Sequence, residues 1–328
     1  MIQRQVTVDD LNVHLRLPEG DVPVLRGINM TLGEGERVGV VGESGAGKSV
    51  LGAALMGLLR PPLEISRGRI EFQGRDLTTM AEPALRRLRG DRMAMIFQDP
   101  LATLNPVLTI GDQLIETLRA HRSLSRRAAR DAALAGLQQV QVPSAAQRMR
   151  QYPHELSGGL RQRAVIAMAL LLEPAVIIAD EPTTAVDVTL QAQIMALLVE
   201  RCRQQRTGLL LITHDLAVVA QTTHRILVMY AGRVVESGPT REVITAARHP
   251  YTRGLLAALP QRGERGRPLA QIPGNMPSVQ DVPSGCPFHP RCPLATTLCS
   301  EVMPAYRPLT GDHWVACHDV DPATTAGR

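Results

Sequence analysis

A glycine-rich loop between an apolar segment and a helical pattern is the feature that most constrains the fold of this chain. Residues 42–49 read Gly-Glu-Ser-Gly-Ala-Gly-Lys-Ser and match the pattern G-x-x-x-x-G-K-S/T, whose backbone N–H groups surround phosphate oxygens. Residues 37–41 predict a short buried strand before the loop, and residues 49–59 predict a helix after it. Because a helix N-terminus favours anions, this order of elements predicts a phosphate site. The residues expected to contact phosphate are Gly42, Ser44, Gly45, Gly47, Lys48 and Ser49.

Lys48 is the only lysine in a chain that contains 36 lysines and arginines together. Its compact ammonium can reach between two phosphates, where the planar guanidinium of an arginine would not fit in the same way. A chain that otherwise uses arginine for its positive charge therefore keeps its single lysine where a point charge is needed.

The composition indicates a core of aliphatic side chains, because hydrophobic residues make up 44% of the chain and aromatic residues only 2%. The formal charge of +5 is compatible with nucleic acid, anionic lipid or nucleotide as a partner. Two groups of arginines indicate solvated helix faces rather than a nucleic-acid surface, because no aromatic residues lie among them. They are Arg86, Arg87, Arg89 and Arg92, and Arg122, Arg126, Arg127 and Arg130.

The N-terminal sequence lacks a basic-then-apolar signal, and no apolar run approaches the length of about 18 residues that a membrane-spanning helix needs. We therefore expect a cytoplasmic protein unless a partner holds it at a membrane.

Apolar segments alternate with helical patterns along the middle of the chain, which predicts an α/β fold with a largely parallel sheet. The expected strands are residues 93–97, 176–179, 209–213 and 226–229, and the expected helices are residues 160–172 and 188–205. Helix-like patterns dominate residues 99–156 and predict a helical insertion. Prolines become frequent in the last part of the chain, where 11 of the 24 lie at or beyond Pro260. We therefore predict a nucleotide-binding domain over residues 1–245, with a helical subdomain at about 99–157, and a loop-rich extension over residues 246–328.

Two further motifs carry candidate chemistry. Asp180 and Glu181 follow an apolar strand, so that Asp180 suits Mg²⁺ coordination beside Ser49 and Glu181 can accept a proton from an attacking water. An acidic pair at a strand end is more often a cap than a catalytic pair. Ser157, Gly158 and Gly159 open a predicted helix upstream, where they form either an ordinary N-cap or a second phosphate cradle.

These motifs, in this order, resemble the nucleotide-binding subunit of an ATP-binding cassette (ABC) transporter. The resemblance includes Gln98 in Phe97-Gln98-Asp99-Pro100, the segment Thr184–Asp187, which is similar to the loop that links the two ATP sites, and His214 after a predicted strand. It covers about residues 1–245 and implies a P-loop NTPase core of the ABC type.

The resemblance also implies the role of each residue. Two subunits would face each other head to tail, with ATP and Mg²⁺ as cofactors. Glu181, His214 and Gln98 would be catalytic, and Ser49, Gln98 and Asp180 would hold Mg²⁺. Ser157, Gly158 and Gly159 would contact the nucleotide held by the partner subunit, and Asp187, in the loop that links the two sites, would be a further nucleotide-binding residue. Where the family stacks an aromatic residue on adenine, this chain has His14 or Leu15, a loss of about 1 kcal/mol in affinity.

Three stretches are similar to the ATP-binding subunits of oligopeptide, dipeptide and nickel importers. They are residues 97–106, residues 153–157, and residues 249–252 together with the cysteine-bearing tail. The resemblance implies ATP hydrolysis coupled to the import of di- or oligopeptides, with nickel complexes, glutathione and opines as open alternatives. It implies a second, homologous but distinct ATPase subunit, two transmembrane permease subunits and an extracytoplasmic substrate-binding protein. The chain would lie peripherally on the cytoplasmic face of the cell membrane and bind no nucleic acid.

The alternative from another class is a soluble cassette ATPase that acts on nucleic acid or ribosomes. Repair ATPases of this type insert a long coiled coil, and translation factors fuse two cassettes in one chain. The sequence has neither feature.

Four of the five cysteines lie close together in the tail, with the spacing Cys286-x5-Cys292-x6-Cys299-x17-Cys317. They could be small buried hydrophobes, although this does not explain their density in a proline-rich segment. Four thiolates could hold zinc, but the tight cysteine pairs common in zinc sites are not present, and wider loops suit an iron–sulfur cluster at least as well. The resembling subfamily carries a 4Fe–4S cluster at these cysteines, so the resemblance implies that cluster, with zinc as the alternative. Cys202 is expected to be an ordinary core residue.

Overall fold

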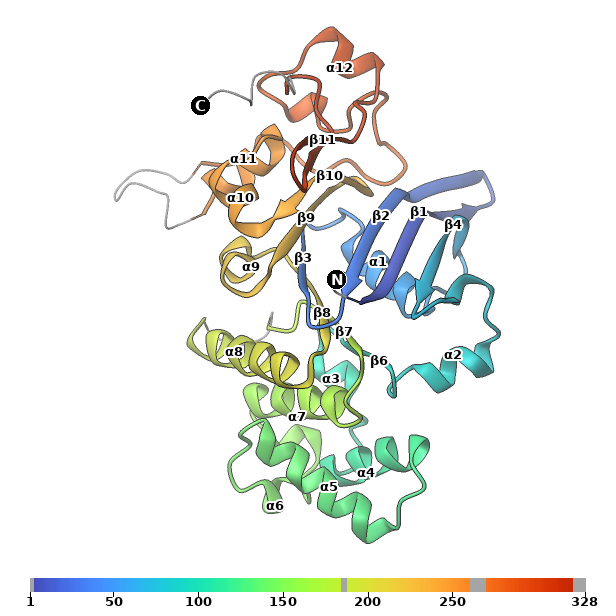
Figure 1. Ribbon diagram of the computed structural model, residues 1–328, viewed down its shortest axis with the longest axis vertical. Coiled ribbons are helices and arrows are strands. Elements are labelled where there is room, and N and C mark those ends of the chain that lie inside the picture. The colour runs from blue at the N-terminus through green and yellow to red at the C-terminus, as the bar shows by residue number, and fades with distance from the viewer. Residues whose placement is uncertain (1–2, 184–187, 260–269, 321–328) are drawn as a thin grey trace. The chain divides into compact units, whose positions relative to one another are not determined.

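The computed structural model describes residues 3–183, 188–259 and 270–320, and the described chain divides into two compact units (Figure 1). Unit 1 consists of Met1–Gln5, Leu32–Glu36 and Thr79–Leu210. Unit 2 consists of Val6–Thr31, Arg37–Thr78 and Leu211–Arg328. Strand β8 (Gly208–Thr213) contributes residues to both units.

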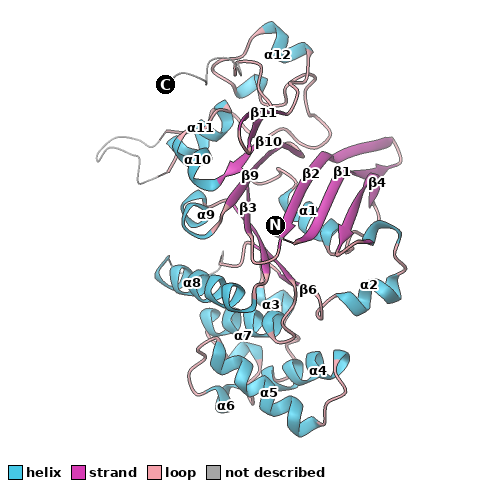
Figure 2. Cartoon of the chain, viewed as in Figure 1, coloured by secondary structure: helices cyan, strands magenta, loops and turns pink. Residues whose placement is uncertain are grey.

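Unit 1 contains a parallel strand pair and a run of helices. Strand β6 (Met93–Ile96) pairs with β7 (Val176–Asp180) in the register Met93↔Val176 to Ile96↔Ala179. The helical elements are α2 (Glu82–Leu88), α3 (Pro100–Thr103), α4 (Ile110–His121), α5 (Arg126–Gln139), α6 (Ala145–Arg148), η2 (Pro153–Glu155), α7 (Gly158–Leu170) and α8 (Val188–Gln205). Between β6 and β7 the chain forms helices and no strand, as the sequence predicts (Figure 2).

Local signals determine where these helices begin. The hydroxyl of Thr109 accepts a hydrogen bond from the N–H of Asp112 at 3.1 Å, and the hydroxyl of Ser125 accepts one from Ala128 at 3.2 Å. Each bond satisfies an N–H group in the first turn that has no partner within the helix. Buried residues spaced by three or four positions, such as Ala129, Ala133 and Leu137, then pack α5 against α4 and α7.

Unit 2 contains a four-stranded sheet in the order β2-β1-β4-β5 that the sequence did not predict. Its strands are β1 (Arg4–Leu17), β2 (Gly20–Gly33), β4 (Leu63–Phe72) and β5 (Arg75–Asp76). The ends of β1 and β2 at Arg4, Gln5, Leu32 and Gly33 belong to unit 1. β1 and β4 are antiparallel, and their register shifts between Asp9 and Val13.

Unit 2 also contains five strands that are successive neighbours in a second sheet, in the order β11-β12-β10-β9-β3. Its strands are β3 (Arg37–Val41), β9 (Arg225–Tyr230), β10 (Arg233–Pro239), β11 (Arg307–Thr310) and β12 (His313–Val315). The expectation of a parallel sheet holds for β3 with β9, but β9, β10, β12 and β11 pair antiparallel. For β9 and β10 the reason is the tight turn at Ala231 and Gly232, where φ is 45° and 77°, because such a turn joins consecutive strands as a hairpin.

The remaining helical elements of unit 2 are short: α1 (Lys48–Leu55), η1 (Leu77–Thr79, whose last residue belongs to unit 1), α9 (Leu216–Thr222), α10 (Thr240–Thr245), α11 (Pro250–Ala257), η4 (His289–Arg291) and α12 (Thr297–Glu301). Helix α1 ends earlier than residue 59, where the sequence placed its end. The reason is Gly57, whose φ of 60° is the left-handed conformation that commonly terminates helices.

The cores of the units are largely aliphatic, as expected, and most of the buried aromatic side chains form one cluster. Tyr230, Tyr251 and Phe288 have ring centroids 4.7–5.4 Å apart. Thus three of the eight Phe, Tyr and Trp residues of the chain meet at one place in unit 2.

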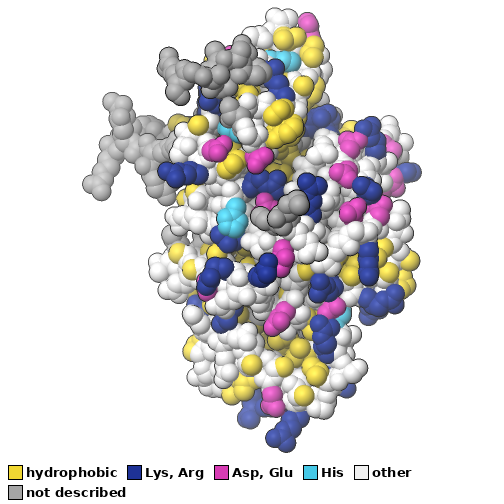
Figure 3. Space-filling model, in the orientation of Figure 1, with side chains coloured by type: hydrophobic (Ala, Val, Ile, Leu, Met, Phe, Trp, Pro, Cys, Tyr) yellow, Lys and Arg dark blue, Asp and Glu magenta, His cyan; other side chains and the backbone are white. Residues whose placement is uncertain are grey.

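The arginine-rich helices of unit 1 carry exposed ion pairs rather than a continuous basic surface. Arg89 pairs with Glu82, Arg122 with Asp91, and Arg126 with Asp112. Figure 3 shows basic side chains spread among acidic ones on the visible face. Such pairs contribute little to stability but keep these helix faces solvated.

None of the helices within residues 3–183, 188–259 and 270–320 combines the length and the apolar character needed to cross a membrane.

Candidate nucleotide site and cysteine pocket

Close packing in unit 2 requires glycine at two positions of the 42–49 loop, Gly42 and Gly47. Buried strand β3 leads into the loop, and φ is +157° at Gly42, +85° at Gly45 and +97° at Gly47, values that residues with side chains rarely adopt. A Cβ at Gly42 would lie 2.3 Å from the carbonyl oxygen of Met229, and a Cβ at Gly47 would lie 2.9 Å from Cδ2 of Leu25. The loop therefore follows a path that is closed to larger residues at both positions.

Lys48 lies buried at the start of α1, and its ammonium turns back onto the loop. Its Nζ donates to the carbonyl oxygen of Gly42 at 2.8 Å and to that of Glu43 at 2.9 Å. Ser44, Gly45 and Ser49 are exposed beside it. The loop thus presents exposed backbone, a hydroxyl group in the first helical turn and one held cation, which is the donor set expected for phosphate.

His214 is exposed in unit 2 directly after β8. The next residue, Asp215, caps α9 by accepting hydrogen bonds from the N–H groups of Ala217 at 2.8 Å and Val218 at 3.2 Å. The predicted position of His214 at the end of a strand is confirmed, and Asp215 fixes the turn that carries it.

In unit 1 the structure brings Gln98 and Glu181 together. β6 and β7 are parallel neighbours, so the residues that follow them meet at one edge of the pair. The Nε2 of Gln98 donates to Oε2 of Glu181 at 3.3 Å. Asp180 is 6% exposed at the end of β7, and Glu181 has a φ of +46°, in the left-handed region. A non-glycine residue in this conformation stores strain, which is common at functional sites.

The structure does not support an ordinary N-cap at Ser157. Ser157 precedes α7, but its hydroxyl makes no capping hydrogen bond with the helix. Ser157 and Gly158 are exposed, whereas Gly159 is buried so closely that a Cβ would lie 2.4 Å from Cδ2 of Leu190. The hydroxyl of Ser157 and the N-terminus of α7 therefore face solvent at this end of unit 1. Asp187, in the segment Thr184–Asp187, lies outside the described residues.

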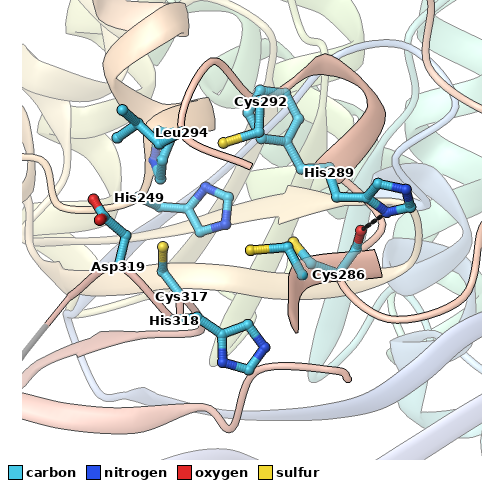
Figure 4. A pocket seen from close by; sticks show the side chains of 11 residues that line it. His249, Cys286, His289, Cys292, Leu294, Cys317, His318 and Asp319 are labelled. Atoms are coloured by element: carbon cyan, nitrogen blue, oxygen red, sulfur yellow. Dashed lines mark hydrogen bonds between the residues drawn. The ribbon is translucent and has the colours of Figure 1, made fainter. Parts of the chain in front are cut away.

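The four tail cysteines line one small pocket in unit 2, together with His249, Phe288, His289, His318 and Asp319 (Figure 4). Cys286 and Cys299 are joined through their backbones, since the N–H of Cys286 donates to the carbonyl oxygen of Cys299 at 2.8 Å. Burial raises the pKa of the Cys286 and Cys292 thiols, and it raises the pKa of Cys317 to about 11. Burial therefore disfavours the thiolate form of these three cysteines, and a bound cation would be needed to stabilise it.

Within the described part of the chain, no three His, Cys, Asp or Glu side chains come together in a way that would hold a metal ion. The structure thus gathers the four cysteines but gives no support of its own for the expected 4Fe–4S cluster, and none for zinc. Cys202 is buried in α8, as expected for a core residue.

Known proteins match both parts of the chain. Residues 25–184 match the family described as ABC transporter. Residues 235–299 match the family described as the C-terminal region of oligopeptide/dipeptide transporters. The oligopeptide transport ATP-binding protein OppD of Escherichia coli (strain K12) is 48% identical over 299 residues, which cover 91% of this chain and 88% of that protein.

This chain belongs to the ABC transporter family.

Other similar proteins extend this result. The dipeptide transport ATP-binding protein DppD of Escherichia coli (strain K12) is 45% identical over 323 residues, which cover 98% of each chain. A solved structure, the dimeric post-hydrolysis state of the ATP-binding cassette MJ0796 bound to ADP and Pi, has a TM-score of 0.65 and 27% identity. The match covers 72% of this chain and 99% of the MJ0796 chain. These matches confirm the predicted ABC-type ATPase and its P-loop fold, and they do not support the nucleic-acid alternative.

Sequence reasoning missed Arg291 and gave Glu43 no role beyond its place in the loop. Arg291 precedes Cys292, and Glu43 is one of the variable positions of the loop pattern. No spacing rule connects two such residues, so only the folded chain could pair them.

Proposed function

We propose that this ABC protein is the ATP-hydrolysing subunit of an importer for di- or oligopeptides. The observation that carries the proposal is the match over both parts of the chain: the ABC region, and a tail region described for oligopeptide/dipeptide transporters. The relatives named for oligopeptide and dipeptide transport are matched by this chain over 88–98% of their own lengths, which supports the same assignment. Within residues 3–183, 188–259 and 270–320, nothing favours a nickel complex, glutathione or an opine over peptides.

We propose the following division of labour at the nucleotide site. Residues 42–49 would bind the phosphates of ATP, with the Lys48 ammonium as their fixed positive charge. Ser49, Gln98 and Asp180 would hold Mg²⁺, which when bound supplies charge stabilisation at the phosphates. Glu181 would accept the proton of the attacking water, with Gln98 holding one carboxylate oxygen of Glu181 in place by the 3.3 Å hydrogen bond.

We infer that the exposed start of α7 serves a second nucleotide. The free hydroxyl of Ser157 and the backbone of Gly158 and Gly159 would contact ATP bound to a partner ATPase subunit. His214 would contact the terminal phosphate, and Asp187 would link the two sites. The proposed assembly contains a distinct homologous ATPase, two transmembrane permease subunits and an extracytoplasmic substrate-binding protein. It places this chain peripherally on the cytoplasmic face of the membrane. We also propose a nucleotide-binding domain over residues 1–245 and a tail over residues 246–328.

Substitution of Glu181 by Gln tests the catalytic assignment. In the assembled transporter, Glu181→Gln should bind ATP normally and hydrolyse it about a hundredfold or more slowly, because the positioned base is lost. Glu173→Gln is the matched control, since Glu173 is an exposed glutamate of unit 1 that also has a positive φ, of 53°. Near-normal hydrolysis by Glu181→Gln would overturn the assignment.

We further propose that Cys286, Cys292, Cys299 and Cys317 hold one 4Fe–4S cluster. The proposal comes from the resemblance of the tail to that of peptide importers, and all four cysteines line one pocket. Anaerobically purified protein should contain about four irons per chain, and replacing any of the four by Ser should remove them. Cys202→Ala, outside the pocket, should keep the iron. Zinc without iron would point to a zinc site, and absence of both metals would leave four ordinary buried thiols.

A further inference from the structure

Arg291 joins the cysteine-bearing tail to the glycine loop within unit 2. Its side chain is only 5% exposed, and its guanidinium binds both carboxylate oxygens of Glu43, with Nη1–Oε2 at 2.7 Å and Nη2–Oε1 at 3.0 Å. Two parallel charge-assisted bonds are the strongest form of this contact and fix the orientation of both groups. Arg291 is the last residue of η4, directly before Cys292.

The guanidinium of Arg291 is itself held from several sides. Its Nε donates to the carbonyl oxygen of Pro273 at 2.8 Å, and its Nη2 donates to that of Gly274 at 3.3 Å. It lies 5.8 Å from the ring centroid of Tyr230 and 6.0 Å from that of Phe288. The aromatic cluster therefore packs around this cation, and Arg291 cannot move without disturbing the tail segment that it binds.

Glu43 is fixed at three separate points. Its N–H donates to the hydroxyl oxygen of Tyr251 at 2.8 Å, its carbonyl oxygen accepts from Nζ of Lys48 at 2.9 Å, and its carboxylate binds Arg291. Two of these partners, Tyr251 and Arg291, come from the last eighty residues of the chain. The same tail reaches the loop again at Gly45, where an added Cβ would lie 3.7 Å from Cγ of Met276.

We propose that Arg291 is a positioning residue of the nucleotide site: by neutralising and holding Glu43, it keeps the glycine loop able to accept the phosphates of ATP. The folded tail then completes the nucleotide site rather than being an accessory to it. This inference rests on the proposed role of residues 42–49 in phosphate binding.

The physical reason is the charge of Glu43. A carboxylate in a phosphate-binding loop repels an anionic ligand unless a cation compensates it. Glu43 is the first variable residue of the loop, and its side chain is 31% exposed, so solvent alone screens the carboxylate only in part. Arg291 both cancels the charge and directs the carboxylate toward the tail.

The test is a cycle of variants made in the full 328-residue chain, with ATP affinity measured by equilibrium titration. Arg291→Ala should raise the Kd for ATP about tenfold, because one like-charge interaction becomes uncompensated. Adding Glu43→Gln to Arg291→Ala should restore the Kd to within about threefold of the wild type, because the repelling charge is gone. Arg241→Ala, at an exposed arginine in α10, is the matched control and should leave the Kd unchanged.

The rescue separates positioning from a merely structural role. If Arg291 only stabilised the fold, the double variant would bind ATP no better than Arg291→Ala, and that result would overturn the proposal. Wild-type affinity in Arg291→Ala would overturn it as well. If Arg291→Ala does not fold, Arg291→Gln provides the same comparison, because it removes the charge but keeps a polar side chain of similar length. It should bind ATP more weakly than the wild type and be improved by Glu43→Gln.

Lys48→Ala, measured in parallel, distinguishes this inference from the proposed function. Unchanged ATP binding in Lys48→Ala would show that residues 42–49 are not the phosphate site. Lost binding in Lys48→Ala, with no effect of Arg291→Ala, would reject the role of Arg291 alone.

Discussion

Substitution of Gly42 by Ala tests whether packing, rather than phosphate, requires the first glycine of the loop. The new Cβ would lie 2.3 Å from the carbonyl oxygen of Met229 and 3.1 Å from Cβ of Ala46. The Met229 oxygen belongs to β9, whose Val228 is paired with Val41 immediately before the loop. The backbone therefore has to shift on one side of a buried strand pair.

The expected cost has two parts. A residue with a side chain at the φ of +157° costs about 1–3 kcal/mol, and forcing a methyl group into a packed site adds about 1–3 kcal/mol. Gly74→Ala is the matched control, because Gly74 also has a positive φ, +79°, but an added Cβ meets nothing within 4 Å. The control should lose only the backbone contribution of about 1–3 kcal/mol.

Hydrogen exchange of the β3 and β9 amides, measured without nucleotide, provides the assay. Gly42→Ala should lower the opening free energy of the β3 and β9 amides by about 1–3 kcal/mol more than Gly74→Ala lowers it for the same amides. Equal protection in the two variants, with ATP binding lost only in Gly42→Ala, would refute the reasoning and assign Gly42 to phosphate contact instead.

Two other predictions follow from the same structure. Mg-ATP should protect Lys48 from an amine-reactive probe, since its ammonium is the only lysine amine in the chain; equal labelling with saturating nucleotide would contradict its placement at phosphate. Burial lowers the pKa of His249 to about 4, from about 6.5 when unfolded, so the unfolded chain binds the extra proton between these values. The contribution of neutral His249 to the free energy of unfolding should therefore be fully present above pH 6.5. This free energy should fall by about 3 kcal/mol as the pH drops to 4. In His249→Asn the side chain can still accept the 3.0 Å hydrogen bond from the N–H of Tyr251, but it does not titrate. The thermal midpoint of His249→Asn should therefore depend less on pH than that of the control His154→Asn, which replaces an exposed histidine. The same decline in His249→Asn as in the control would exclude His249 as its cause.

The strands and helices around the motifs could be predicted because local sequence determines them. The buried residues of β3, β7 and β8 form uninterrupted apolar runs, and α8 spans Val188–Gln205, the predicted range. Each of these segments keeps a single pattern of apolar residues along its length, so it can be predicted without information from distant residues.

The sheet of β1, β2, β4 and β5 could not be predicted in this way, because β1 changes phase. Its buried residues are Val6 and Val8 before the register shift, and Leu11 and Val13 after it. An irregularity that moves the inward face from even to odd positions destroys the alternation by which a strand is detected. Gly68 marks the place, since an added Cβ there would lie 2.2 Å from the carbonyl oxygen of Asp10.

The sequence by itself located the short contiguous motifs to which we assign chemistry: the glycine loop with Lys48, the Asp180-Glu181 pair and the serine–glycine turn before α7. In such motifs, neighbouring residues supply both the side chains and the backbone path. Only the tertiary structure decided which distant residues act on these motifs. Glu43 and Arg291 are 248 positions apart, and their pairing exists because the tail adds β11 and β12 to the sheet that contains β3 and brings η4 to the loop. A contact of this kind depends on the whole chain being folded, since no local pattern records which surface a distant arginine will meet.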